Sequence, residues 1–274
     1  MCCWSSSPQI VDCTIVENRT SRGGGLLCLY GGAPAISNCT ILRNVVTGPG
    51  GGLFCGYVEA TISNCTIAEN TAGEGGGLSS VGSSATLTNC TLAANSASVG
   101  GAVHNSDGSA TLTNCILWND LPNEIHSVPG DVVVTYSDVQ GGWAGEGNID
   151  ADPLFVGGFL GDYYLSQTAA GQPVDSPCVD AGSDTAENLG LDTRTTRTDQ
   201  VGDAGIVDMG YHYPIVCVGD LDGDNDTDQA DLGILLADWG CDDPVNGCAG
   251  DLNGDDRTDQ ADLGILLGDW GCTN

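Results

Sequence analysis

Residues 10–120 repeat one short phrase five times, and this repeat limits the possible fold more than any other feature of the chain. The phrase reads IVDCTIVEN, ISNCTILRN, ISNCTIAEN, LTNCTLAAN and LTNCILWND, and its first cysteine recurs at intervals of 26, 26, 25 and 25 residues. A glycine run, such as GGGLL from Gly23, separates successive phrases. A period near 25 is too short for a propeller blade and has no helical spacing, so it predicts the coils of a parallel β-solenoid.

The phrase also predicts where each coil turns. In ISNCTI, Ile62 and Cys65 lie three residues apart, so both side chains point inward only if a residue between them interrupts the strand. Asn64 suits this role because asparagine tolerates the left-handed backbone conformation. The equivalent residues are expected to form a ladder of stacked side-chain amides: Asn38, Asn64, Asn89 and Asn114. A second corner is expected at the asparagines near the end of each phrase: Asn18, Asn44, Asn70, Asn95 and Asn119.

A cysteine occupies the same place in every coil. These residues are expected to form a buried column of small apolar side chains: Cys13, Cys39, Cys65, Cys90 and Cys115. Five members cannot all pair, and parallel stacking gives poor disulfide geometry. Cys28 and Cys55 are expected to form a second short stack, with a disulfide between them as the alternative.

The composition excludes several classes of partner. The formal net charge is −31, and the chain contains six arginines and no lysine. Such a surface repels nucleic-acid phosphates and anionic lipid, so we expect neither nucleic-acid binding nor membrane insertion. No segment approaches the ~20 apolar residues of a membrane-spanning helix. We expect an extracellular or cell-surface protein whose export signal and first coils are missing from this truncated chain.

The NCT-type phrases and glycine runs resemble the right-handed parallel β-helix repeats of secreted bacterial proteins. The later segments YSDVQGG, GNIDADPLF, SPCVDAG and VDMGYHY resemble the closing segment of planctomycete-like secreted β-helices. This resemblance covers roughly residues 10–214. It implies a mainly β protein, with β-helix coils over residues 1–138 and a closing segment over residues 139–216. It implies a function only loosely.

Residues suited to catalysis are sparse in the repeats. Acidic residues are few between residues 10 and 120, and none of them form a DD or D-x-D pair. Asp150 and Asp152 do form a D-x-D pair, which we interpret as turn chemistry. We expect Trp118, Trp143 and Tyr136 to pack at the end of the solenoid. The alternative is that these three aromatic residues form a sugar-stacking platform. We therefore expect a non-catalytic solenoid. The alternatives are a carbohydrate-active enzyme, either a polysaccharide lyase or a glycoside hydrolase, and an adhesin that binds a polysaccharide or cell-surface glycan.

A twelve-residue acidic loop occurs twice near the C-terminus, as DLDGDNDTDQAD and then DLNGDDRTDQAD. Oxygen-bearing side chains at loop positions 1, 3, 5, 9 and 12 predict two bound Ca²⁺ ions. The ligands expected in loop one are Asp220, Asp222, Asp224, Asp226 through its carbonyl, Asp228 and Asp231. Those expected in loop two are Asp251, Asn253, Asp255, Arg257 through its carbonyl, Asp259 and Asp262. Because carboxylates crowd these loops, we expect calcium binding and folding to be coupled.

Each loop leads into an apolar stripe, which predicts two short helices packed on each other. The stripe residues are Leu232, Leu235, Leu236 and Trp239, then Leu263, Leu266, Leu267 and Trp270. Residues 217–274 thus resemble a type I dockerin, a calcium-binding module of paired F-hands. The resemblance implies a cohesin-like partner and a binding face that includes Gln229, Ala230, Gln260 and Ala261. Position 6 departs from the usual glycine, as Asn225 and Asp256, and the basic residues that often assist cohesin recognition are absent.

Four cysteines frame this module. A helix of about ten residues is ~15 Å long, so cysteines at opposite ends of one loop–helix unit would struggle to meet the ~7 Å Cα limit of a disulfide. If the two units pack antiparallel, Cys217 approaches Cys272 and Cys241 approaches Cys248. We predict these two disulfides.

Overall fold

The computed structural model describes residues 1–224, 226–243 and 247–272. The chain divides into two compact units, Met1–Tyr213 and Pro214–Asn274, and each is considered by itself. Within the described residues, no helix has the length and apolar character needed to cross a membrane.

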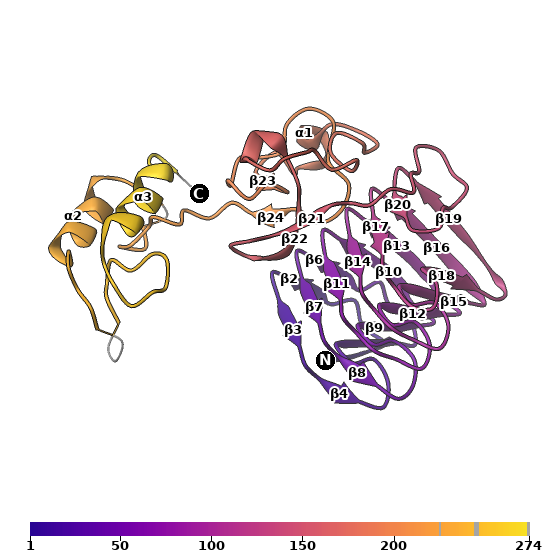
Figure 1. The fold of residues 1–274 in the computed structure, drawn as a ribbon. Helices are drawn as coiled ribbons and strands as arrows, with labels where there is room; N and C mark the ends of the chain where they lie inside the picture. The colour runs from indigo at the N-terminus through magenta and orange to yellow at the C-terminus, as the bar shows by residue number, and fades with distance from the viewer. Residues whose placement is uncertain (225, 244–246, 273–274) are drawn as a thin grey trace. The chain divides into compact units, whose positions relative to one another are not determined.

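The first unit contains a parallel solenoid of six coils, built from three six-stranded sheets (Figure 1). Sheet 1 contains β1 (Cys2–Trp4), β5 (Leu26–Leu29), β9 (Leu53–Gly56), β12 (Leu78–Val81), β15 (Val103–Ser106) and β18 (Ile125–Ser127). Sheet 2 contains β2 (Gln9–Val11), β6 (Ala35–Ser37), β10 (Glu59–Ser63), β13 (Ser84–Thr88), β16 (Gly108–Thr113) and β19 (Gly130–Thr135). Sheet 3 contains β3 (Thr14–Val16), β7 (Thr40–Leu42), β11 (Thr66–Ala68), β14 (Thr91–Ala93), β17 (Ile116–Trp118) and β20 (Asp138–Val139). The prediction of a parallel β-solenoid is confirmed.

The interior is filled by residues that occupy equivalent places in successive coils. Ile36, Ile62, Leu87 and Leu112 are in register on sheet 2 and are fully buried or nearly so. The expected cysteine column lies beside them: Cys39, Cys65, Cys90 and Cys115 are buried, and Cys13 is half-buried.

The cysteine thiols of the solenoid are reduced. In the column each thiol hydrogen bonds to the carbonyl two residues earlier, as Cys90 does to Thr88 O at 3.3 Å. Burial raises the pKa of the Cys90 thiol well above its usual range, so it stays protonated. Cys28 and Cys55 stack in register and are also free thiols, so the alternative disulfide between them does not form.

The first corner forms as predicted, but its amide ladder does not. Asn38, Asn64, Asn89 and Asn114 all have left-handed backbones, with φ between 47° and 54°. Asn64 Nδ2 donates to Asn38 Oδ1, yet it also donates to the backbone carbonyl of His212, and Asn64 Oδ1 accepts the His212 N–H. Asn114 Oδ1 accepts from Ser183 N. The expectation of a continuous ladder is therefore wrong, because these corner amides bind the closing segment instead.

A continuous ladder runs along the second corner. Asn44 donates through both its backbone N and its Nδ2 to Asn70 Oδ1, at 2.9 and 3.0 Å, and Asn70 donates in the same way to Asn95. Asn95 then donates to Asp120 Oδ1 at 2.6 and 2.8 Å. The prediction that Asn119 continues this series is wrong by one residue. Asn119 instead takes the left-handed conformation that precedes each ladder position.

The third bend of each coil comes just before the strand of sheet 1, and the glycine runs allow it for two different reasons. Gly50 has φ of 74°, which favours glycine. Gly51 has an ordinary φ, but a Cβ there would lie 2.3 Å from the carbonyl oxygen of Gly76 in the next coil. The second glycine is therefore required by the close stacking of the coils.

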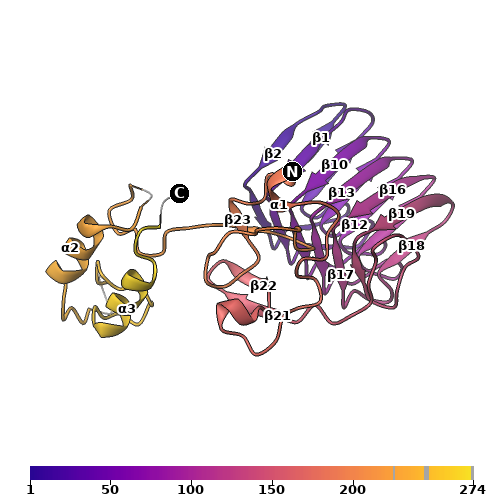
Figure 2. The ribbon, with the colours of Figure 1, turned by 90° about the horizontal axis from the view of Figure 1, so that it is seen from above.

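The rest of the first unit lies partly along the side of the coils (Figures 1 and 2). Its elements are β21 (Phe155–Gly158) paired antiparallel with β22 (Gly161–Leu165), the 3₁₀ helix η1 (Thr168–Ala170), α1 (Ala186–Leu189) and β23 (Arg194–Thr195) paired with β24 (Tyr213–Pro214). One further pair, β4 (Arg19–Thr20) with β8 (Val45–Val46), extends the first coils. Trp143 packs against the core, and Ile149 pairs with Asp138 of the last coil.

A buried histidine–aspartate contact helps hold this closing segment in place. His212 is fully buried; its Nε2 lies 2.8 Å from Asp203 Oδ2 and its Nδ1 lies 3.1 Å from the carbonyl of Gly210. The backbone of the same residue is bonded to Asn64, so this contact and the solenoid corner are joined.

Candidate metal centres

The second unit consists of two acidic loops, each followed by one helix. These are α2 (Gln229–Ala237) and α3 (Gln260–Gly268). Each helix begins after an aspartate that accepts from its first turn, Asp228 from Ala230 N and Asp259 from Ala261 N. Each also has a capping box, completed by Asp231 in the first helix. The capping aspartates therefore fix the start of each helix at the end of its loop.

Loop one brings its early carboxylates together. Oxygens of Asp220, Asp222 and Asp224 all lie within 4.8 Å of one another. Asp220 Oδ1 accepts from the backbone N–H groups of Gly223 and Asp224, at 2.7 and 3.2 Å, and these bonds curl the chain around the carboxylates. A second group, Asp226, Asp228 and Asp231, meets the same limit.

The carboxylate at loop position 12 is part of the loop's own framework. Asp231 Oδ1 accepts from Leu221 N at 2.7 Å and from Asp222 N at 3.1 Å, while its Oδ2 accepts from Asp228 N at 2.8 Å. Burial raises the pKa of Asp231, but these backbone N–H groups outweigh burial and lower it overall. The carboxyl is thus held ionised, and Oδ2, which accepts one of these bonds, keeps lone-pair capacity for a cation.

Loop two repeats this arrangement with different side chains. Asp262 accepts from Leu252, Asn253 and Asp259 as its counterpart does in loop one. Position 6 is Asp256, with φ of 68°, so a left-handed turn forms without glycine. Asn225, the equivalent residue in loop one, lies outside the described residues. Arg257 points its guanidinium toward Asp242, 3.6 Å away.

The donor set suits a hard divalent cation. Every side chain that converges in these loops offers oxygen, and the loops contain no histidine. Burial and the neighbouring Asp224 raise the pKa of Asp222, and burial together with Asp224 and Asp228 raises that of Asp226. These shifts record carboxylate repulsion that a cation would neutralise. A third convergent group, at Asp238, is no metal centre, because its two cysteines form a disulfide.

Each loop is tied to the end of the helix that follows the other loop. Thr227 of loop one donates through Oγ1 to Asp269 Oδ2 at 2.8 Å, and Gly219 N donates to the same oxygen at 2.7 Å. Thr258 of loop two donates to Asp238 Oδ2 at 2.7 Å. These links were not predicted from the sequence. The available signal was that Thr227 and Thr258, and likewise Asp238 and Asp269, occupy equivalent positions of the two repeats.

Both predicted disulfides are confirmed. Cys217 pairs with Cys272, with a Cα–Cα distance of 5.5 Å, and Cys241 pairs with Cys248 at 5.8 Å. The two bonds close opposite ends of the antiparallel pair of loop–helix units. Helix length disfavoured a bond within either loop–helix unit, and the assumed antiparallel packing of the units gave the two pairs that form.

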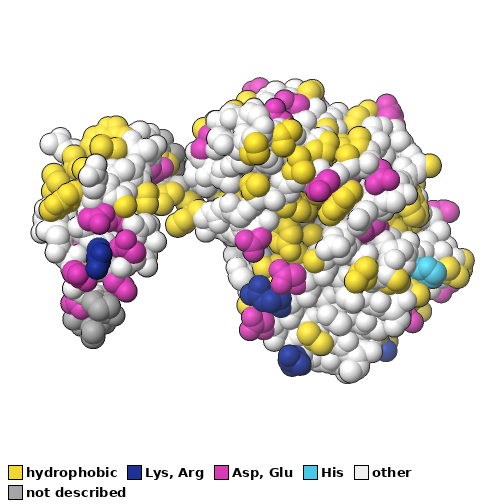
Figure 3. All heavy atoms as spheres, in the orientation of Figure 1, with side chains coloured by type: hydrophobic (Ala, Val, Ile, Leu, Met, Phe, Trp, Pro, Cys, Tyr) yellow, Lys and Arg dark blue, Asp and Glu magenta, His cyan; other side chains and the backbone are white. Residues whose placement is uncertain are grey.

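The two helices bury only part of their apolar stripes. Leu235 and Leu266 are fully buried, and Leu232 and Leu263 are half-buried. The other four residues of the two stripes are exposed by 47–54%: Leu236, Trp239, Leu267 and Trp270. The prediction that the two helices pack on each other is confirmed, but helices this short bury only about one side-chain row at their contact. Figure 3 shows hydrophobic side chains at the surface of this unit.

The four predicted partner-binding residues are exposed. Ala230 and Ala261 each follow the first residue of a helix, with Gln229 and Gln260 before them. They lie at the start of the same two helices that carry the exposed Leu236 and Leu267.

The candidate sites on the solenoid have structural roles. Asp150 Oδ1 accepts from Gly141 N, and Asp152 Oδ1 accepts from Leu154 N, as turn chemistry predicts. Trp118 packs against a closing-segment cluster, and Trp143 packs against the core. Tyr136 hydrogen bonds to Glu146 at 3.0 Å. These three aromatic residues do not form one platform.

One pair of carboxyl groups was not foreseen. Asp120 and Glu124 are 4% and 6% exposed, and Glu124 Oε1 accepts from the backbone N of Asp120 at 3.1 Å. Burial raises the pKa of Asp120 to about 6, and burial together with contact with Asp120 raises that of Glu124 to about 10. The two carboxyl groups are in contact and so cannot flank a glycosidic bond, which requires carboxyl groups at least ~5 Å apart.

Comparison with known proteins supports the solenoid and is silent on the second unit. Residues 1–118 match a family model described as a right-handed β-helix region. No curated protein and no solved structure matched the chain significantly. Together with the parallel sheets, the family match identifies the first unit as containing a right-handed parallel β-helix.

Proposed function

We propose that this protein is a non-catalytic right-handed β-helix that is attached to other proteins by a calcium-dependent, dockerin-like module at residues 217–274. The observation that carries the proposal is the duplicated loop–helix unit. Two acidic loops of matching sequence, the first with convergent carboxylates, each run directly into a capped helix. Ca²⁺ would be held by the loop carboxylates, and its charge would offset their mutual repulsion.

The two exposed helix faces support attachment to a partner. Ala230 and Leu236 on α2 correspond to Ala261 and Leu267 on α3, and all four are exposed. Apolar side chains clustered on a small helical unit are typical of protein-binding surfaces. Because the two faces carry the same residues, a cohesin-like partner would bind in either of two orientations.

The disulfides support a location outside the cytoplasm. Structural disulfides persist in oxidising compartments and are rare where thiols are kept reduced. The buried cysteines of the β-helix remain reduced in such a compartment because burial excludes oxidants and parallel stacking gives poor disulfide geometry. We therefore place the protein in the extracellular space or on the cell surface.

Calorimetric titration of the full chain with CaCl₂, after removal of metal with EDTA, tests the module. Two ions are expected to bind. The Asp220→Asn, Asp224→Asn double variant should bind one, because it removes two of the three early carboxylates of loop one. The control variant Glu187→Gln, Asp192→Asn loses the same charge at exposed positions of the first unit and should still bind two. Identical titrations for both variants would refute the assignment.

Docking is tested separately with the calcium-loaded protein. Leu236→Asp should remove one of the two equivalent faces and leave binding to a cohesin-like protein intact, whereas Leu236→Asp with Leu267→Asp should abolish it. Binding that persists in the double variant, or that is unaffected by EDTA, would contradict the proposed mode of attachment.

A further inference from the structure

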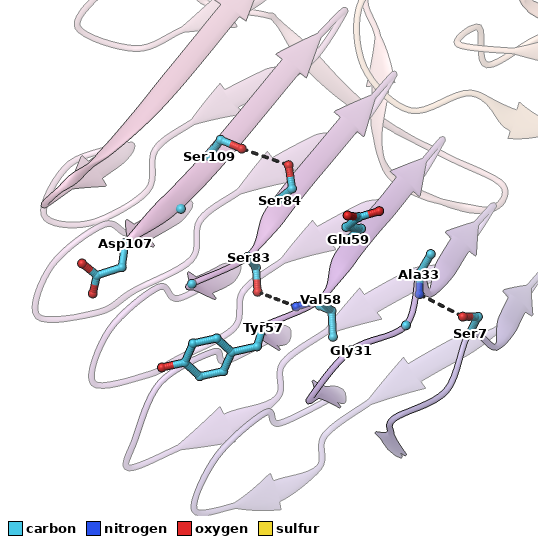
Figure 4. A pocket seen from close by; sticks show the side chains of 13 residues that line it. Ser7, Gly31, Ala33, Tyr57, Val58, Glu59, Ser83, Ser84, Asp107 and Ser109 are labelled. Atoms are coloured by element: carbon cyan, nitrogen blue, oxygen red, sulfur yellow. Dashed lines mark hydrogen bonds between the residues drawn. The ribbon is translucent and has the colours of Figure 1, made fainter.

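A groove of about 740 Å³ crosses successive coils of the β-helix at the corner between sheets 1 and 2 (Figure 4). It is lined by short segments that recur once per coil, from Ser7 through Tyr57–Glu59 to Asp107–Ser109. The groove runs along the solenoid axis, across the strands rather than parallel to them. Such a shape fits an extended polymer better than a compact small molecule.

Two rows of side chains form the walls. The inner row begins sheet 2, where Glu59, Ser84 and Ser109 are in register, and the two serine hydroxyls are 2.9 Å apart. The outer row lies at the corner, where Tyr57 and Asp107 project from different coils in Figure 4. The floor between the rows is made of buried residues, among them Val58 and Ser83.

Aromatic rings extend the outer row. The Tyr57 ring lies 6.2 Å from that of Tyr30 at an interplanar angle of 7°, and the Tyr30 ring lies 4.6 Å from that of Trp4. These rings are 61%, 51% and 62% exposed, in that order. The result is a continuous aromatic strip on the surface, beside the polar groove.

The fold does not require these tyrosines. Both have left-handed backbones, with φ of 62° and 57°, which costs a bulky side chain about 1 kcal/mol. The same corner position is Ser5, Gly82 and Asp107 in other coils, and all of these share the positive φ. Tyr30 and Tyr57 thus have a strained backbone and an exposed ring at a position where smaller residues form the same corner. Strain that the packing does not need is a sign of function.

The lining selects the chemistry of the occupant. Exposed aromatic rings offer π faces to C–H groups, serine hydroxyls donate to and accept from ligand hydroxyls, and carboxylates accept from them. Among the described residues that line the groove there is no arginine, the only charged side chains are Glu59 and Asp107, and the protein carries a net charge of −31. Polyanions such as polyuronates are therefore repelled.

We infer that this groove binds a neutral polysaccharide chain, laid along the solenoid axis with its sugar rings against Tyr30 and Tyr57 and its hydroxyl groups bonded to Glu59, Ser84 and Ser109. The site does not depend on the calcium module, and it differs from the aromatic residues that the sequence suggested.

The test uses the full chain and calorimetry with cello-, xylo- and mannohexaose as neutral probes, chitosan hexamer as a cationic probe and hexagalacturonate as an anionic one. At least one neutral hexaose should bind, and hexagalacturonate should not. The double variant Tyr30→Asn, Tyr57→Asn removes the rings while keeping residues that tolerate a positive φ, and it should weaken binding at least tenfold. Phe159→Ala removes a ring that is 62% exposed elsewhere in the unit and should have no effect.

Further variants separate this site from the alternatives. Glu59→Gln keeps hydrogen-bonding capacity and should change binding of a neutral hexaose by less than about threefold. A preference for the chitosan hexamer that this variant abolishes would show a cation site and overturn the inference. The inference also fails if no neutral hexaose binds at millimolar concentration, if the double tyrosine variant binds normally, or if Trp143→Ala abolishes binding instead.

Discussion

The asparagine ladder of the second corner should contribute more to stability at its centre than at its end. Asn70 is fully buried and its side chain makes four hydrogen bonds: Oδ1 accepts from the backbone N and the Nδ2 of Asn44, and Nδ2 donates to the carbonyl of Ile41 and to Asn95 Oδ1. Asn70→Ala removes all four and leaves buried donors and acceptors without partners. Each unsatisfied buried group costs about 1–3 kcal/mol, so we expect the free energy of unfolding to fall by about 3–5 kcal/mol.

The first member of the same ladder supplies a matched control. Asn18 is exposed, and its Nδ2 donates to the carbonyl of Val16 and to Asn44 Oδ1, at 3.1 and 2.9 Å. Water replaces these bonds when the side chain is removed, so Asn18→Ala should cost less than about 1 kcal/mol.

Urea denaturation followed by far-UV circular dichroism measures both changes. The midpoint of the Asn70→Ala variant should fall well below that of Asn18→Ala, with similar slopes. If the two variants lose equal stability, the side-chain bonds of the buried ladder do not hold the coils together. Equal losses would instead point to backbone stacking alone.

Three further predictions concern titration, thiols and cross-links. Because the folded pKa of Glu124 is raised to about 10 from an unfolded value near 4.5, stability should decline as pH rises through this range; Glu124→Gln, which donates to Asp120 without titrating, should flatten that decline in thermal melts. Iodoacetamide should label the exposed Cys2 of the native protein while the buried thiols of the column react only in denaturant, as peptide mass mapping would show. Replacing Cys217 and Cys272 by alanine should destabilise the second unit by roughly 1–2 kcal/mol more than removing the other disulfide, because it opens a loop of 55 residues rather than 7.

The corners and interior columns of the solenoid could be predicted from the sequence because each coil places the same residue types at the same positions. The spacing between Ile62 and Cys65 required a corner at Asn64, and the structure has one there. The cysteine column follows from the same register. The disulfides were predictable because helix length disfavours pairing within one loop–helix unit, and an antiparallel arrangement of the two units then brings the observed pairs together.

Where the repeat ends, the sequence no longer determined the outcome. Residues after the last coil have no periodicity. Nothing in the sequence therefore indicated that the backbone of His212 would hydrogen bond to the side-chain amide of Asn64, 148 residues earlier. The same contact broke the predicted ladder. At the other corner, the repeat pattern grouped Asn119 with Asn18, Asn44, Asn70 and Asn95, whereas the register of the coils puts Asp120 at the equivalent position.

By itself, the sequence determined the parts that depend on spacing along the chain: the solenoid coils, their corners, the helix starts and the pairing of the module's cysteines. Only the tertiary structure decided which surfaces remain open. Tyr30 and Tyr57 lie 27 residues apart and become neighbours because one coil stacks on the next. Leu236 and Leu267 stay exposed because two short helices have too little contact area to cover both stripes. Burial and exposure are properties of the packed chain, and a residue's spacing does not specify them.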